Sequence, residues 1–514
     1  MTAVFLSGID SMIRKSSVVA IIVVVPVMLL CWQLALSEET TEKAVSSDAK
    51  LFQGWGKPDV ALLITGRQHG YIEPCGCTGL TNQRGGLARR YTLLKQLRAK
   101  GWDVVSLDAG NQVRRFGAQA AAKFQSTVDG LREMDYRAVG LGPDDLRLSA
   151  GELYAALADP EGQSTESDIF ICANVDLFGA GIIGGFRVIE TGGMKIGVAA
   201  VLGTNELKRV TQSEVTKRAP MEALKATMAE IKKLDCDFQV LLSHASLDES
   251  RLFAKAFPQL DLVVTTGGAG EPTFRPEEIA GTKAVMIQAG TKGMYAGVVG
   301  IFRDGTEDEL RYQRVPLDAR FEDSREMLDL LAAYQDKLKE QGLQGLGLTP
   351  VRHPSGRKYV GSEACGDCHT QAYEKWLTTP HHHATVAISD PNERSEIPRH
   401  FDPECISCHV TGWNPQQFIP YDSGYLDLEQ SVAMHGNGCE NCHGPGSAHV
   451  AAENGELDDL TDELIETYRE QMRLPLADAR AKCLECHDLD NDPHFHEEGM
   501  FDKYWEQVAH PWSD

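Results

Sequence analysis

The sequence predicts a two-domain fold, in which an α/β layered domain is followed by a smaller, mainly α-helical domain, with one transmembrane helix at the N-terminus. Three observations predict this fold. Short apolar runs alternate with helical patterns in the first half, the motif Cys-x-x-Cys-His occurs four times near the C-terminus, and one long apolar run lies near residue 27. These features divide the chain into five ranges: 1–37, 38–57, 58–318, 319–357 and 358–514.

The apolar run covers residues 18–36, and Arg14 and Lys15 precede it. It is long enough to cross a bilayer, and the positive-inside rule places the residues before it in the cytoplasm. We therefore expect a single-pass inner-membrane anchor with the bulk of the chain on the periplasmic, extracytoplasmic side. Residues 35–37 also resemble a signal-peptide cleavage site, so secretion to the periplasm after cleavage is the alternative. The polar residues 38–57 are typical of a tether.

The range 58–318 has the pattern of a layered α/β domain. Helices are predicted at residues 88–98 and 221–233, and a hairpin is predicted at residues 188–201. Short apolar runs predict five buried strands, at residues 60–65, 103–107, 170–174, 238–243 and 261–266.

Several segments of this domain also resemble a known family, the calcineurin-like metallophosphatases, and in particular its exported 5′-nucleotidase branch. The resemblance implies a four-layered α/β/β/α sandwich. The segments follow one another in the family's order: TGRQHGYIEPC (65–75), GGLARR (85–90), SLDAGN (106–111), LLSHAS (241–246), DLVVTTGGA (261–269) and MIQAGTKGMYAGVVGI (286–301).

Most metal ligands of that family have no counterpart in this chain. His69 and His244 match ligand positions, but Arg67 stands in place of the first aspartate and Asn111 in place of the bridging aspartate. Other ligand positions are taken by Pro143, Asp144, Gly267 and Ala269. Because two-metal hydrolysis needs a nearly complete ligand shell, we expect no dinuclear metal and no phosphatase activity. A residual metal-dependent phosphatase or nucleotidase is the alternative.

Cys75 and Cys77 follow His69 in the same loop. Two thiols one residue apart could form a strained disulfide, bind a soft metal, or react as a thiolate assisted by Arg67 or Arg84. An inert structural pair is the simpler alternative. The candidate redox or metal site of this domain therefore consists of Cys75, Cys77, His69 and His244, and the sequence assigns no catalytic residue.

The range 319–357 begins with a predicted helix at residues 322–341. Asp323 and Glu326 resemble a capping box, and Gly342 is expected to end the helix. We expect this helix to pack the first domain against the second. Its predicted apolar face is formed by Met327, Leu330, Leu331, Tyr334 and Leu338.

The four Cys-x-x-Cys-His motifs have the spacing of covalent haem attachment. Two thiols separated by two residues can bond to the two vinyl groups of one haem, and the imidazole of the next residue reaches the iron. A single copy would leave a zinc knuckle or a disulfide cluster open. Four copies indicate four covalent haem c groups, held by Cys365, Cys368, Cys405, Cys408, Cys439, Cys442, Cys483 and Cys486, with proximal ligands His369, His409, His443 and His487.

The range 358–514 is too short to build an ordinary hydrophobic core around four haems, so we expect the haems themselves to form the core. Segments of this range resemble the cytochrome c-554 family of four-haem electron carriers. They are YVGSEACGDCH, EKWLTTPHHHA, CISCHVTGW, GCENCHGPGSAHV, CLECHD and FDKYWEQVAH.

That resemblance implies distal iron ligands at His381, His449 and His510, and His435 and His400 are weaker candidates for a fourth. Two histidines on each iron favour electron transfer. An iron without its sixth ligand would be open to a small nitrogen compound. The sequence leaves both alternatives open.

The formal net charge of −24 excludes nucleic acid as a partner and favours a basic redox protein. The acidic segment 456–466 is either a solvated helix face or a docking patch. We expect a membrane-anchored tetrahaem cytochrome that carries electrons between redox partner proteins, for which basic proteins and membrane quinol oxidoreductases are the two candidates. The alternative is an oxidoreductase that acts on a small nitrogen or sulfur compound at an open haem or at the Cys75/Cys77 pair.

Overall fold

The computed structural model describes residues 51–74, 83–115, 117–158, 162, 167–303, 305 and 309–510. Residues from Gly56 onward form one compact unit. The predicted anchor at residues 18–36 and the pair Cys75/Cys77 lie outside the described residues. None of the described helices is both long enough and apolar enough to cross a membrane.

The first sheet of the N-terminal domain has five strands in the order β13-β12-β1-β2-β3. β1 pairs in parallel with β2, and β2 pairs in parallel with β3. β12 runs antiparallel to β1, and β13 runs antiparallel to β12. The strands are β1 (Val60–Thr65), β2 (Val104–Asp108), β3 (Tyr136–Val139), β12 (Tyr295–Ile301) and β13 (Leu310–Pro316).

The second sheet has six strands in the order β10-β11-β9-β8-β6-β5. Its centre is parallel, and antiparallel pairs close both edges, including the predicted hairpin of β5 and β6. The strands are β5 (Phe186–Thr191), β6 (Met194–Leu202), β8 (Phe238–His244), β9 (Leu262–Thr265), β10 (Glu277–Glu278) and β11 (Val285–Gln288). A separate small pair is formed by β4 (Val175–Leu177) and β7 (Val215–Lys217).

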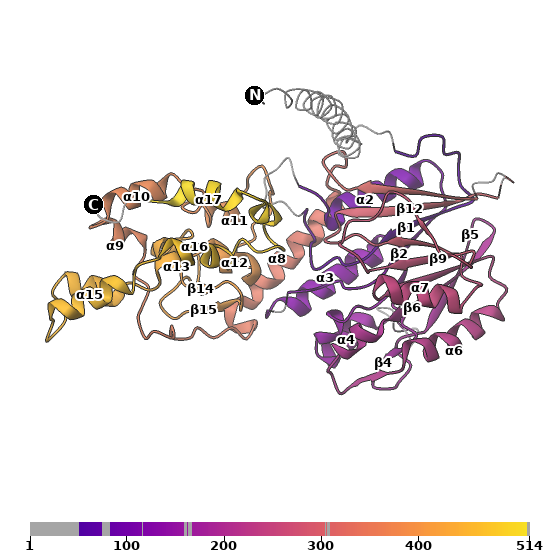
Figure 1. Cartoon of the computed structure of the whole chain (residues 1–514), viewed down its shortest axis with the longest axis horizontal. Helices are drawn as coiled ribbons and strands as arrows, with labels where there is room; N and C mark the ends of the chain where they lie inside the picture. The colour runs from indigo at the N-terminus through magenta and orange to yellow at the C-terminus, as the bar shows by residue number, and fades with distance from the viewer. Residues whose placement is uncertain are drawn as a thin grey trace, which may run out of the picture. The chain divides into compact units, whose positions relative to one another are not determined.

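The two sheets pack face to face, and helices cover their outer faces (Figure 1). One buried cluster joins Leu62 and Val299 of the first sheet to Val240 and Val264 of the second. A second cluster lies between the other face of the second sheet and the helices α6 (Pro220–Lys232) and α7 (Leu247–Ala256). On the first sheet the cover is formed by α2 (Gly86–Ala99) and α3 (Ala120–Glu133). The four-layered α/β/β/α order is therefore present.

The sequence located most of these elements, but one predicted strand is wrong. Residues 170–174 are buried, yet they make only isolated bridges, between Phe170 and Val139 and between Ile171 and Gly184. The remaining elements of this domain are short: α4 (Ala150–Leu157), α5 (Thr204–Lys208) and a 3-10 turn at Asp145–Arg147.

Helix α8 (Arg325–Gly345) joins the two domains. Met327 and Leu331 are buried on its N-terminal half, which lies against α2 and α3. Further along, the Tyr334 hydroxyl donates to a carboxylate oxygen of Asp402 in the C-terminal domain at 2.9 Å. The predicted capping box is wrong, because the N-cap is Ser324 with no side-chain hydrogen bond. Asp323 and Glu326 instead pair with Arg89 and Lys95 of α2.

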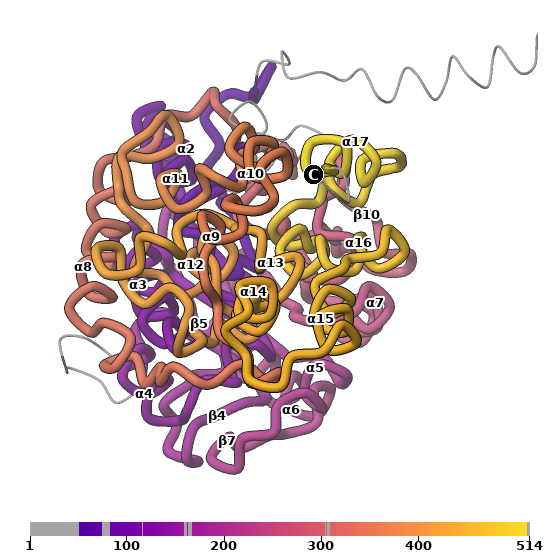
Figure 2. The backbone as a smooth tube through the Cα atoms, turned by 90° about the vertical axis from the view of Figure 1, so that its left-hand side faces the viewer, coloured from indigo at the N-terminus to yellow at the C-terminus, as the bar shows by residue number. Residues whose placement is uncertain are grey.

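The C-terminal domain is built from short helices (Figure 2). Its described apolar core is small and consists of Ile406, Val410, Trp413, Tyr425 and Met434. The helices are α9 (Ser362–Gly366), α10 (Thr370–Leu377), α11 (Val386–Ser389), α12 (Pro403–His409), α13 (Cys439–His443), α14 (Ser447–Glu453), α15 (Asp462–Glu470), α16 (Leu476–Cys483) and α17 (Met500–Val508). Two 3-10 turns (Val432–Met434 and Pro493–His496) and the strand pair β14 (Trp413–Asn414) and β15 (Ile419–Pro420) complete it.

Candidate haem centre and degenerate phosphatase site

Each Cys-x-x-Cys-His motif lies on one turn of helix, which brings its three side chains together. The motifs occur in or directly after α9, α12, α13 and α16. In the first motif the backbone N–H of His369 donates to the carbonyl of Cys365 at 2.9 Å, and in the fourth His487 donates to Cys483 at 2.8 Å. A helical turn places residues that are three and four apart on one face, so both thiols and the imidazole can reach one ligand.

Three proximal histidines are oriented by a hydrogen bond at Nδ1. The acceptor for His409 is the carbonyl of Ala384 at 2.7 Å, and the acceptor for His443 is the carbonyl of Met472 at 2.6 Å. For His487 the partner is a carboxylate oxygen of Asp492 at 2.8 Å. Such a bond fixes the tautomer and leaves Nε2 free to bind a metal.

Three of the predicted distal histidines face proximal ones. The ring centroids of His369 and His449 are 6.2 Å apart, those of His487 and His381 6.2 Å, and those of His443 and His510 5.8 Å. An imidazole nitrogen binds a metal at about 2 Å, so one iron between two imidazoles separates their centroids by about 6 Å. The residues present therefore fit iron held by two histidines at three motifs.

His409 is the exception. No ring pair within the described residues includes it, although His381, the ring partner of His487, also lies close enough for the charge of His409 to lower the pKa of His381, after burial and His487. Of the two candidates for this position, His435 is engaged elsewhere, since its Nε2 is 3.0 Å from the carbonyl of Leu428. The His400 ring lies 3.9 Å from that of the adjacent Phe401, and its buried Nδ1 has no hydrogen-bond partner in the described part of the chain. Burial lowers the pKa of His409 to about 4, which keeps its ring neutral and able to bind a metal at pH 7.

The thiols of different motifs lie close together. Interaction with Cys439 raises the pKa of Cys365, and interaction with Cys408 raises the pKa of Cys486. Burial is the main cause that raises the pKa of Cys442, and the charge of Cys483 is the next. These contacts link the first motif to the third, the third to the fourth, and the fourth to the second, and α9, α12, α13 and α16 gather accordingly in Figure 2. The motifs thus form one chain of neighbours.

In the N-terminal domain, Arg67 occupies the loop region where the resembling family binds metal. Its guanidinium donates to the carbonyl oxygens of Ala289 at 2.8 Å, Gly290 at 3.3 Å and Gly268 at 3.5 Å. The pKa of Arg67 is lowered to about 10, first by burial and then by Arg114. A positive charge of the chain itself therefore ties these loops together.

The histidines of this site are also engaged. Nδ1 of His244 lies 2.8 Å from the carbonyl of Ala109, and burial lowers the pKa of His244 to about 4. Nδ1 of His69 lies 3.3 Å from the Thr291 hydroxyl. Burial, followed by the charges of Arg114 and Arg67, holds the pKa of His69 well below its usual value. Across the described residues, no group of three or more His, Cys, Asp and Glu side chains could hold a metal ion.

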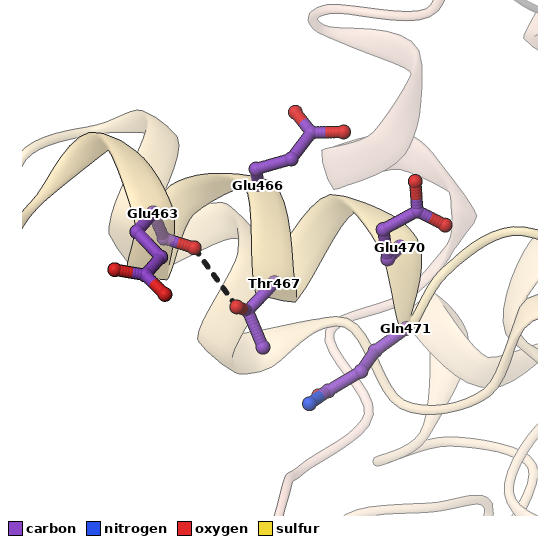
Figure 3. Close-up of a pocket in the computed structure, with 5 residues that line it drawn as sticks. All are labelled: Glu463, Glu466, Thr467, Glu470 and Gln471. Carbon is purple, nitrogen blue, oxygen red and sulfur yellow. Dashed lines mark hydrogen bonds between the residues drawn. The ribbon is translucent and has the colours of Figure 1, made fainter.

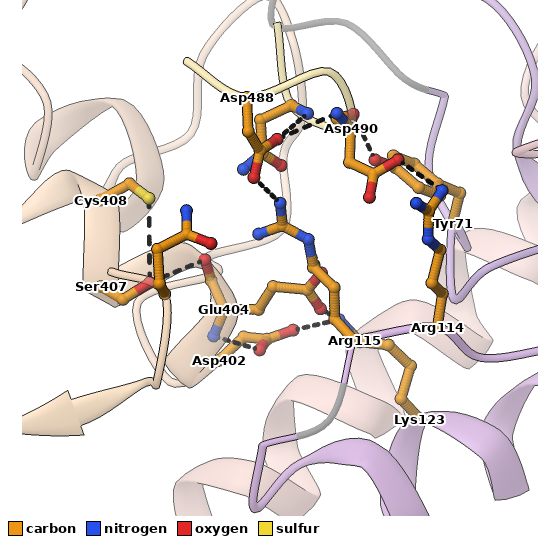
Figure 4. Close-up of polar contacts among 12 residues, drawn as sticks. Tyr71, Arg114, Arg115, Lys123, Asp402, Glu404, Ser407, Cys408, Asp488 and Asp490 are labelled. Atoms are coloured by element: carbon orange, nitrogen blue, oxygen red, sulfur yellow. Dashed lines mark hydrogen bonds and ion pairs between the residues drawn. The ribbon is translucent and has the colours of Figure 1, made fainter. Parts of the chain in front are cut away.

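A set of ion pairs between the two domains was not expected from the sequence (Figure 4). Glu404 directly precedes Cys405 and Asp488 directly follows His487, so two of the carboxylates flank haem motifs. Two features of the sequence could have indicated these ion pairs: the adjacent arginines at positions 114 and 115, and the acidic residues that flank the haem motifs. The pairs are Arg114–Asp490, Arg115–Asp488, Arg115–Glu404, Lys123–Asp402, Lys123–Glu404, Lys292–Asp490 and Glu73–Arg399.

The acidic segment predicted at 456–466 ends in α15. A pocket on this helix is lined by Glu463, Glu466, Thr467, Glu470 and Gln471 (Figure 3). Its charge is offset locally, because Glu466 pairs with Arg469 and Arg473, and Glu470 also pairs with Arg473. This arrangement favours a solvated helix face over a docking patch.

The fold and these sites define a c-type cytochrome domain that follows a phosphatase-like α/β sandwich. A family model described as cytochrome c554 and c-prime matches residues 364–444. Cytochrome c-554 of Nitrosomonas europaea is 29% identical over 98 residues, which are 17% of this chain and 39% of that protein.

The N-terminal part matches nucleotide-hydrolysing proteins. An apyrase of Aedes albopictus is 24% identical over 304 residues, 54% of this chain and 53% of that protein. A 5′-nucleotidase precursor from Thermus thermophilus aligns with a TM-score of 0.46 and 18% identity, over 62% of this chain and 66% of that one. The chain spans about half the length of the curated nucleotidase relatives that it matches. It is therefore a fusion of a 5′-nucleotidase-like part with a cytochrome c-554-type part.

Proposed function

We propose that the protein is a tetrahaem c-type cytochrome that carries electrons between redox partner proteins on the periplasmic side of the inner membrane, anchored by residues 18–36. The observation that carries this proposal is the set of three facing histidine pairs, with ring centroids 5.8–6.2 Å apart, at three of the four haem motifs. Two histidines on one iron exclude other ligands, which suits electron transfer rather than substrate binding.

The residues of this chain would bind, orient and shield the cofactor. Haem c supplies reversible one-electron chemistry when it is bound. Nδ1 hydrogen bonds of His409, His443 and His487 hold the ligand rings in place. The neighbouring thiols of the four motifs bring the attachment points into one continuous series, as electron transfer over short distances requires.

The haem count and the spin state test this proposal. Intact-mass measurement of the mature protein should show four added haems, and its electron paramagnetic resonance spectrum should contain at least three low-spin ferric signals. A bare polypeptide, or fewer than three haems, would contradict the proposal.

Fractionation of cells should place the protein with the inner membrane. Recovery in the soluble periplasmic fraction would favour signal cleavage instead.

We further propose that the phosphatase-like domain is an accessory module without a dinuclear metal. This rests on Arg67, whose guanidinium binds three carbonyls in the loops concerned. A buried guanidinium repels divalent cations at short range. Metal analysis should find no stoichiometric manganese or zinc, and nucleotides should not be hydrolysed. Stoichiometric metal together with turnover would restore the phosphatase alternative.

A second function is favoured by one observation: His381 lies close enough to His409 to interact with it, but its ring pairs with His487, and no other described imidazole ring pairs with His409. We propose as the alternative an oxidoreductase that acts on a small nitrogen or sulfur compound at this motif. Burial lowers the pKa of His409 most, and the charges of Arg394 and then Arg399 lower it further, so Arg399 lies near this histidine. Arg399 also forms an ion pair with Glu73, which precedes Cys75 by two residues in the sequence. Binding of carbon monoxide or nitric oxide to one haem in four would favour this function. Four low-spin haems that bind neither gas would exclude it.

A further inference from the structure

The segment after the fourth haem motif forms a turn that closes on its own histidine. The backbone N–H of Asp492 donates to the carbonyl of Asp488 at 2.8 Å. One carboxylate oxygen of Asp488 accepts the N–H groups of Asp490 at 2.9 Å and Asn491 at 2.8 Å. The turn thereby brings the Asp492 carboxylate to Nδ1 of His487. The Asp492 side chain is 4% exposed and that of His487 is 27% exposed, so the carboxylate lies on the buried side of this contact.

The outer side of the same turn is held by the phosphatase-like domain (Figure 4). Arg115 pairs with the other carboxylate oxygen of Asp488, and Arg114 pairs with Asp490 at 2.9 Å. Lys292 donates to the carbonyl of Asp490 at 2.5 Å, and the Tyr71 hydroxyl donates to the same carbonyl at 2.6 Å. The exposed fraction of the Lys292 side chain is 6% and that of Arg115 is 14%.

The four contacts come from the loops around the degenerate site. Tyr71 follows His69 by two residues, and the N–H of Lys292 donates to the carbonyl of Arg67 at 2.8 Å. Lys292 also adopts a left-handed backbone conformation, with φ of 54°, which costs energy for a residue other than glycine. The surrounding structure therefore holds this side chain toward the turn.

The partner of His487 differs in kind from those of the other oriented proximal ligands. His409 and His443 face neutral backbone carbonyls, whereas His487 faces a carboxylate. A carboxylate acceptor draws the Nδ1 proton more strongly and makes the imidazole more electron-donating, which stabilises the ferric over the ferrous state.

We propose that the phosphatase-like domain acts as a clamp that fixes the turn Asp488–Asp492, and that Asp492 thereby lowers the reduction potential of the haem at the fourth motif. Asp492 is a positioning residue, because it acts on the iron through His487. This inference rests on the proposed haem c at Cys483 and Cys486. It gives the phosphatase-like domain a role that requires no hydrolysis.

The first test is Asp492→Asn in the full-length protein. A reductive titration followed by electron paramagnetic resonance should show one haem potential raised and the other three unchanged. Asp492→Glu, which keeps a carboxylate, should return that potential toward the wild-type value. If all four potentials stay unchanged in Asp492→Asn, the assignment of Asp492 is wrong.

The second test addresses the clamp, with the double variant Arg115→Gln/Lys292→Gln. Loss of two nearby positive charges, acting through space alone, would lower the potential of the haem. Release of Asp492 from His487 would raise it, so the sign separates the two effects. We expect a rise, and we expect no further rise when Asp492→Asn is added, because both changes break the same contact. A fall or no change would overturn the clamp.

The control is Arg251→Gln, which breaks a more exposed ion pair with Glu277 within the sandwich, and all four potentials should remain unchanged. Every variant is first checked by intact mass. Fewer than four haems in the wild-type protein would count against the proposed function rather than against the clamp. If Asp492→Asn alone loses a haem, the sign of the shift in the Arg115→Gln/Lys292→Gln variant still decides the question.

Discussion

The interiors of the two domains of this chain differ in how many apolar side chains they bury. In the sandwich, side chains such as Leu62 and Val240 fill the space between two sheets and are at most 1% exposed. In the cytochrome domain, the described helices α10 and α15 bury no residue, and seven of the eight motif cysteines are at intermediate exposure. The first domain is stabilised by its own apolar side chains, whereas the second has few buried apolar side chains, as expected for a domain whose interior is to be filled by haem.

The difference also explains the polar contacts. In the sandwich, the buried carboxylate of Asp145 is satisfied within the domain, because it accepts the backbone N–H groups of Asn111, Gln112 and Gly142. The cytochrome domain keeps imidazole nitrogens available and binds its loops to the sandwich through ion pairs. The phosphatase-like domain is therefore held by ion pairs to a domain that has a small apolar core of its own.

The largest difference between the two domains is expected when the protein contains no haem. When the full-length chain is produced without haem attachment, we expect residues 358–510 to lose their structure while the sandwich stays folded. Limited proteolysis should cut throughout the C-terminal domain and spare residues 58–318, whereas the haem-loaded protein resists at both. Equal protection of the C-terminal domain in the apo chain would show that it has a sufficient core of its own.

The next variant affects one motif in four. His449→Ala removes the ring that faces His369 at 6.2 Å, so one iron should lose its second imidazole. The number of haems that bind carbon monoxide should rise by one relative to wild type, with the sandwich unaffected. The matched control is His494→Ala, whose side chain is 39% exposed and lies beside Glu497. An unchanged carbon monoxide stoichiometry in His449→Ala would remove His449 from the ligands.

The local parts of the molecule could be predicted from sequence. β1 and β8 are buried on both faces, so Val60–Thr65 and Phe238–His244 appear as continuous apolar runs. The haem motifs depend only on spacing within one helical turn. Residues 170–174 misled the prediction because they are apolar and buried but lack a continuous partner strand. Burial alone does not make a strand.

The contacts between domains could not be predicted, because they join residues far apart in the sequence. Arg114 and Asp490 are separated by 376 positions, and Lys123 and Glu404 by 281. Charged residues are usually solvated at the surface, so a sequence pattern gives no reason to pair these particular ones. In the folded chain, Lys123 of α3 and Tyr334 of α8 both contact Asp402 of the C-terminal domain.

A substitution at the junction of the two domains should have a smaller effect, on the free energy of unfolding. Lys123 lies between Asp402 and Glu404, and its side chain is 12% exposed. Lys123→Ala should lower the free energy of unfolding by about 3–5 kcal/mol, because the buried carboxylate of Asp402 loses its counter-charge and the half-buried Glu404 keeps only Arg115. The matched control is Lys95→Ala, which breaks a lysine–glutamate pair in which both side chains are 43% exposed. Its effect should be about 1 kcal/mol or less. Equal effects in chemical denaturation would show that the junction is solvated.

The smallest expected effect on the free energy of unfolding comes from the loss of a helix N-cap. In the sandwich, Ser149 caps α4 through its side chain, and Glu152 returns a bond to the Ser149 N–H at 2.8 Å. Side-chain caps occur in both domains, because Asp402 caps α12 and Thr461 caps α15, whereas α2 and α3 of the sandwich and α9, α13 and α16 have none. Ser149→Ala should therefore lower the free energy of unfolding of the sandwich by about 0.5–2 kcal/mol and leave the haem spectrum unchanged. The exposed Ser213→Ala serves as the control and should have no measurable effect. A shift in the haem spectrum of Ser149→Ala would mean that the sandwich transmits local changes to the cytochrome domain.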